Sequence, residues 1–189
     1  MISKPDAATA LVDIERIDRR TSRGSAYVRA SSHLLIGGAT WTLGYVACGL
    51  LPPAQWGAVW IPLILLGTIG SFVIGYVTPR THRRDPAERP IEAARILWMT
   101  ATTMAFVVVS FLLFRPTDPV VFLTYPALVM AFVYALLGSL GLPRFRWLGT
   151  GMFAVLILGL LVGRDAIAFW VAAAGGGGLL LGAAWLRKA

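Results

Sequence analysis

Six apolar segments, each long enough to cross a membrane, constrain the fold of this chain more than any other feature. They cover residues 33–52, 57–78, 93–114, 120–140, 146–163 and 167–186. At a rise of about 1.5 Å per residue, helices of this length match a hydrocarbon core about 30 Å thick. Only 14% of the residues are charged, which is roughly half the share in soluble domains. The sequence therefore predicts an all-α protein, with a six-helix transmembrane domain over 33–189 after a polar segment over 1–32.

The distribution of lysine and arginine predicts how these helices are oriented. Fifteen of them lie in the N-terminal segment, in the second and fourth connections and at the C-terminus, whereas the other connections hold only Arg115 and Arg164. Basic residues are retained on the cytoplasmic side, so both termini are expected there. A short basic leader followed by six compact spans resembles small bacterial inner-membrane proteins, and equally the small ligand-binding membrane subunits of vitamin importers. We therefore expect a multi-pass protein of the bacterial cytoplasmic membrane.

The connections on the opposite side are very short, over residues 52–56, 115–119 and 164–166. Short connections make consecutive helices antiparallel neighbours. The six helices are thus predicted to form three antiparallel hairpins.

Small residues recur every four positions on two of the predicted helices, and such faces let helix backbones approach closely. The second helix carries Gly67, Ser71 and Gly75, and the sixth carries Ala174, Gly178 and Gly182. These faces are expected to be buried, within the chain or in a homo-oligomer. The run Gly175–Gly178 weakens its helix and has two interpretations: a thin helix wedged between neighbours, or a hinge where a ligand approaches the backbone.

The spans contain little that could carry out chemistry. No acidic, basic or histidine residue lies in the middle of any span, and no Cys/His cluster suggests zinc, haem or another cofactor. The serines within the spans have no base beside them, so an enzyme is not expected. The polar side chains that remain inside the spans are uncharged. The residues that could line a site for a neutral or lipophilic molecule are Tyr45, Thr103, Tyr134 and Gly176. Alternatively, the hydroxyl groups only bond helix carbonyls.

The polar leader predicts an amphipathic helix over residues 4–23. Leu11, Ile14 and Ile17 form an apolar stripe, and Gly24 is expected to end the helix after a basic last turn. The apolar stripe of such a helix has to pack against a surface. The alternatives are the bilayer, its own bundle and a cytosolic protein. Basic residues that could contact anionic lipid headgroups or a protein partner are Arg19, Arg20, Arg23, Arg83 and Arg84. Nucleic acid is not expected, since no recognition module accompanies the charge.

These features favour a non-enzymatic regulatory or accessory membrane protein, whose basic cytoplasmic face docks a cytosolic or membrane partner and which could sense a lipophilic ligand. The alternative is a small transporter, or transporter subunit, for a neutral or hydrophobic solute. In that case Tyr45, Thr103 and Tyr134 would line the path, and the glycine run would act as a gate.

Overall fold

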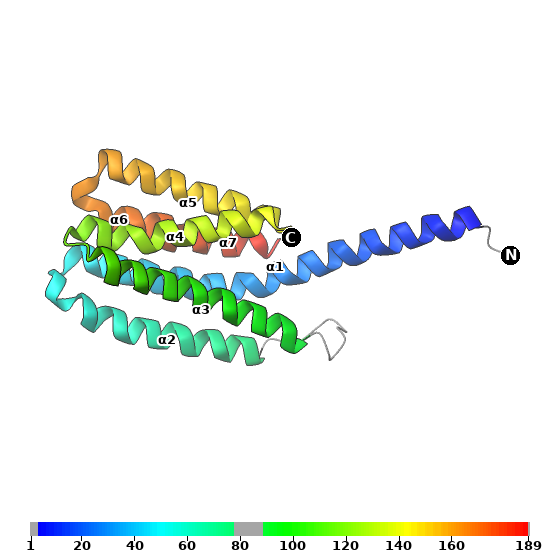
Figure 1. The fold of residues 1–189 in the computed structure, drawn as a ribbon, viewed down its shortest axis with the longest axis horizontal. Helices are drawn as coiled ribbons and strands as arrows, with labels where there is room; N and C mark the ends of the chain where they lie inside the picture. Colours follow the sequence, from blue (N-terminus) through cyan, green and yellow to red (C-terminus); the bar gives the residue numbers. More distant parts are fainter. Residues whose placement is uncertain (1–3, 78–88, 189) are drawn as a thin grey trace.

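The computed structural model describes residues 4–77 and 89–188, and every regular element in these two ranges is helical (Figure 1). The α-helices are α1 (Lys4–Leu50), α2 (Trp56–Val77), α3 (Arg89–Phe114), α4 (Pro119–Ser139), α5 (Pro143–Val162), α6 (Ile167–Val171) and α7 (Gly178–Leu186). Two short 3-10 helices, η1 (Pro53–Gln55) and η2 (Arg164–Ala166), precede α2 and α6, and a π-helix, η3 (Ala172–Gly177), joins α6 to α7.

Within these ranges, six helical stretches are long and apolar enough to cross a membrane, which confirms the predicted number of spans. They are Ala26–Leu50, Pro53–Ile74, Leu97–Phe114, Pro119–Ser139, Pro143–Val162 and Arg164–Leu186. The first begins at Ala26 rather than at residue 33. The last combines η2, α6, η3 and α7, and we call it the sixth span.

The predicted helix end at Gly24 is wrong, because α1 continues through this residue without a break. A glycine in a helix interior costs only about 1 kcal/mol relative to alanine, which the long flanking helix can absorb. The leader and the first span are consequently one rod of 47 residues. Its N-terminal part extends well beyond the rest of the molecule (Figure 1).

The core lies between α1, α4, α5 and the sixth span. Residues of α1 that recur every three or four positions face it: Tyr27, Ser31, Leu34, Gly38, Trp41, Tyr45 and Cys48. This spacing keeps one face of a helix against its neighbours. The buried apolar residues form two clusters, one around Tyr45 and Leu156 and the other around Leu34 and Met152.

The helices α2 and α3 lie at the periphery. α2 packs on α1, with Gly67 against Thr40, and α3 meets α4 through aromatic rings and a 2.8 Å hydrogen bond that the Tyr125 hydroxyl donates to Ser110. Most of their large apolar side chains are exposed, for example Phe72 at 76%. In a bilayer these side chains would face lipid tails, which solvate them as well as protein does.

Candidate functional site

The predicted central site contains two tyrosines, and the structure places them in different parts of the core. Tyr45 packs edge-on against Trp41 and Trp60, with ring centroids 5.5 and 5.0 Å away. Tyr134 stacks on Phe145 in the second cluster, at 5.7 Å. The two aromatic groups are therefore not brought together around one cavity.

The other two predicted residues are also accounted for by local packing. The Thr103 hydroxyl donates a 2.8 Å hydrogen bond to the Met99 carbonyl of its own helix. Gly176 lies against α1, where an added Cβ would collide with the Thr42 hydroxyl and would lie 2.6 Å from the Thr42 nitrogen.

The small-residue face of the sixth span packs within the chain. Ala174 is buried in the first cluster, and Gly182 lies against Leu148 of α5. The Trp41 ring covers Gly175. This geometry is that of a thin helix wedged between its neighbours, and it positions the π-helix between α1 and α5.

The second candidate region is the projecting part of α1, residues 4–25, which we call the α1 arm. At about 1.5 Å per residue it extends some 33 Å. Leu11, Val12, Ile14 and Ile17 are all more than half exposed on it. The predicted basic contacts Arg19, Arg20 and Arg23 lie in the arm, but the structure does not describe their side chains, and Arg83 and Arg84 lie outside the described residues.

Helical register separates the arm into two faces. Leu11, Ile14 and Ile17 are each three positions from the next, so the predicted apolar stripe runs along one side of the helix. Positions 16, 19, 20 and 23 are all arginine and follow the i, i+3, i+4, i+7 pattern of another face. By helical register alone, the apolar positions and the arginine positions thus fall on different sides of the arm.

The arm joins the bundle at a cluster that sequence reasoning missed. The Arg144 guanidinium donates a 2.9 Å hydrogen bond from Nη1 to the Trp185 carbonyl, in the last turn of α7. It also lies 5.6 Å from the ring centroid of Tyr27 and 5.3 Å from that of Trp185. Tyr27 is 5% exposed and packs on Phe145. Arg144 is one of the basic residues from which the orientation of the helices is predicted. In the structure it connects Tyr27, at the base of the arm, to Trp185 in α7.

We expect Arg144→Lys to loosen the base of the arm while keeping the charge. Lysine is a point charge without the planar fork of arginine, so the ring contacts weaken and the carbonyl bond loses its geometry. The free energy of unfolding should fall by about 1 to 2 kcal/mol. Hydrogen exchange at residues 24–30 should accelerate, with Arg146→Lys as the control because Arg146 is exposed and contacts Trp147 of its own helix. Equal exchange in the two variants would contradict this role.

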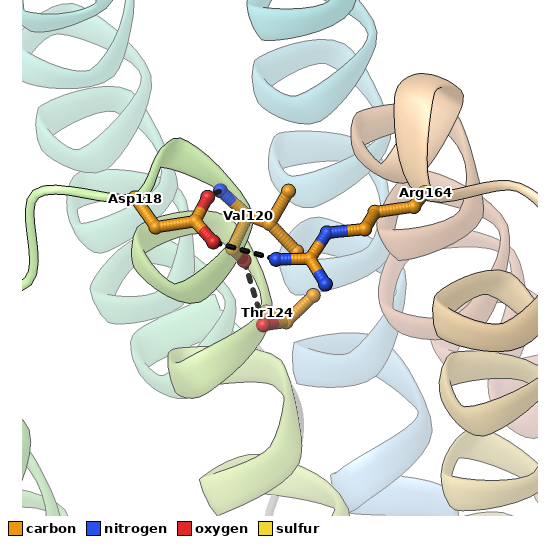
Figure 2. Close-up of polar contacts among 4 residues, drawn as sticks. All are labelled: Asp118, Val120, Thr124 and Arg164. Atoms are coloured by element: carbon orange, nitrogen blue, oxygen red, sulfur yellow. Dashed lines mark hydrogen bonds and ion pairs between the residues drawn. The ribbon is translucent and has the colours of Figure 1, made fainter.

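The opposite end of the bundle carries the 51–55, 115–118 and 163–166 connections, and we call it the distal end. There Asp118 caps α4, since its Oδ1 accepts a 2.8 Å hydrogen bond from the Val120 nitrogen. Its Oδ2 forms a 2.7 Å ion pair with Nη2 of Arg164, which reaches across from η2 (Figure 2). The Thr124 hydroxyl below the pair donates to the Val120 carbonyl. This ion pair links two connections that lie 46 residues apart.

In the part of the chain that the structure describes, no group of three or more His, Cys, Asp or Glu residues could hold a metal ion. No protein-family model, curated protein or solved structure matches this chain.

Proposed function

We propose that the chain is a non-enzymatic accessory or regulatory protein of the bacterial cytoplasmic membrane, which docks a protein partner through the α1 arm. In this proposal both termini are cytoplasmic and the spans form three antiparallel hairpins. The one-sided charge supports the orientation. The observation that carries the docking role is the unbroken helix Lys4–Leu50, whose arm projects beyond the bundle with apolar residues exposed.

A protein partner is favoured over the bilayer surface by the direction of the arm. Because α1 is continuous with the first span, the arm continues roughly along the axis of the bundle (Figure 1). With the bundle in a bilayer, this direction would carry the arm away from the membrane surface. An interfacial helix would instead have to turn at its base to bury its apolar stripe among headgroups. The transport alternative has less support, because Tyr45 and Tyr134 lie in separate clusters and Gly176 has no free space beside Thr42.

The test compares two matched substitutions on the arm, Ile14→Gln and Val12→Gln. The two side chains are 61% and 57% exposed, but Ile14 lies on the apolar stripe and Val12 on the arginine face. Glutamine is a good helix former and leaves the charge unchanged, so the arm itself should persist. After cross-linking in native membranes, quantitative mass spectrometry should show about tenfold less partner with Ile14→Gln and little change with Val12→Gln.

Removing residues 2–23 should abolish the same cross-links. This deletion keeps Tyr27, which belongs to the core, so the unfolding midpoint of the bundle should not change. If the partner is recovered equally from the wild type, Ile14→Gln and the deletion, the docking role is wrong.

A further inference from the structure

A pocket of about 310 Å³ opens at the distal end, outside all the residues predicted to form a site. Three segments far apart in the sequence form it: the end of α1 with the start of α2, the start of α4, and η2 with the start of α6. Leu123 and Ile167, both buried, form part of its apolar wall, and Trp56 and Cys48 also line it. Arg164 and Asp165 provide its charged groups.

The ion pair between Asp118 and Arg164 lies at the edge of this pocket, because Arg164 also lines it. It joins the start of α4 to η2, on which the two charged lining residues lie (Figure 2). Only Nη2 of Arg164 is used in that pair, so the guanidinium keeps donors for an anion. Asp165 is exposed and forms no ion pair with any residue in 4–77 or 89–188, so its carboxylate can accept from a cation.

The charges select among possible occupants. Arg164, Asp118 and Asp165 together carry a net charge of −1, which disfavours a purely anionic group. A zwitterion with an anionic and a cationic part satisfies both Arg164 and Asp165. The carboxylate prefers a primary ammonium, which donates hydrogen bonds, over a quaternary one, which cannot.

The position of the pocket indicates where such a zwitterion comes from. The pocket lies at the end of six candidate membrane helices, and Trp56 beside it is of the residue type that concentrates at the headgroup layer. Its volume equals that of about ten liquid waters, enough for a headgroup and the first methylenes of a lipid. An apolar wall under a charged mouth fits a molecule that is polar at one end only.

We propose that the distal pocket binds the headgroup of an aminophospholipid, with the phosphate on Arg164, the ammonium on Asp165 and the start of the acyl chains on the apolar wall. This proposal is independent of docking by the arm, which lies at the other end of the molecule.

Cys48, the only cysteine of the chain, lines the pocket although it is buried in the structure, so a small reagent that enters the pocket reaches its thiol and reports occupancy. The full chain is reconstituted in nanodiscs of phosphatidylcholine, with or without phosphatidylethanolamine, and the rate at which Cys48 reacts with a small bimane reagent is measured. Phosphatidylethanolamine should slow the reaction about fivefold, the upper end expected for an exposed ion pair, and Asp165→Asn should remove this protection. The control, Gln55→Cys in a Cys48→Ser background, is exposed outside the pocket and should react equally in both lipids.

Native mass spectrometry of the same discs gives a second readout, in which phosphatidylethanolamine should be retained by the wild type and lost from Asp165→Asn. Equal retention and equal Cys48 rates in the two lipids would overturn the proposal. So would equally strong protection by soluble glycerophosphoethanolamine in phosphatidylcholine discs, because it would assign the pocket to a free solute instead of a membrane lipid.

Discussion

Replacing Gly176 with alanine is expected to destabilise the bundle by about 3 kcal/mol, the upper end of the usual cost of overpacking. The added Cβ would collide with the Thr42 hydroxyl and would lie 2.6 and 2.8 Å from the Thr42 nitrogen and Cα. Backbone atoms of α1 cannot move aside as the end of a flexible side chain can. The π-helix and α1 would therefore have to separate along the most buried of the six spans.

The neighbouring glycine provides the control for this prediction. A Cβ on Gly177 would meet nothing closer than the Ala172 carbonyl oxygen at 3.9 Å, so Gly177→Ala should be neutral or stabilise the helix by up to about 1 kcal/mol. Unfolding in mixed micelles, followed by tryptophan fluorescence, measures both variants. Equal unfolding midpoints for the two would show that Gly176 is not wedged against α1.

This pair of variants also bears on the transport alternative. A bulky residue at Gly176 would stop solute uptake whether the glycines act as a gate or only as packing, because the bundle would be disrupted in either case. Gly177 lies in the same π-helix and tolerates a side chain. A change in solute uptake caused by Gly177→Ala would support a gate. Loss of uptake after a substitution of Gly176 would not distinguish a gate from packing.

The second large effect is expected at Gly149, where the backbones of α4 and α5 lie close together. Its Cβ would collide with the Ala135 nitrogen and would lie 2.5 Å from the Ala131 carbonyl oxygen, so Gly149→Ala should also cost about 3 kcal/mol. Gly151 on the same helix has no atom within 4 Å of its Cβ position, and Gly151→Ala should be neutral or slightly stabilising. A loss of less than about 1 kcal/mol at Gly149 would contradict the close approach of these helices.

The six spans could be predicted because apolar length alone fixes them, whereas the start of the first one could not. Residues 26–32 include Arg29, Ser31 and Ser32, which interrupt any apolar run. Tyr27 is nevertheless buried, because Phe145 and Arg144, more than a hundred residues away, cover it. A signal was present in the spacing of Tyr27, Ser31 and Leu34, which continues the buried face of α1 towards the N-terminus.

Other features depend on contacts between distant segments and leave no local pattern. The glycine run indicated a weakened helix, but its π-helical form accompanies packing against Trp41 and Thr42. At the distal end Asp118 and Arg164 form an ion pair, and the sequence shows only that each lies in a short connection. The central site was predicted from polar residues that share helix faces. In the structure these residues make separate contacts, Tyr45 with Trp41 and Tyr134 with Phe145.

The central claim is that the chain crosses the membrane with its arm in the cytoplasm and its distal end outside. Single-cysteine variants in a Cys48→Ser background test it, with Thr21→Cys on the exposed arm and Gln55→Cys at the exposed distal end. In intact bacterial cells a membrane-impermeant maleimide should label only Gln55→Cys, and Thr21→Cys should react only after the membrane is opened. Labelling of Thr21→Cys from outside intact cells would contradict the account.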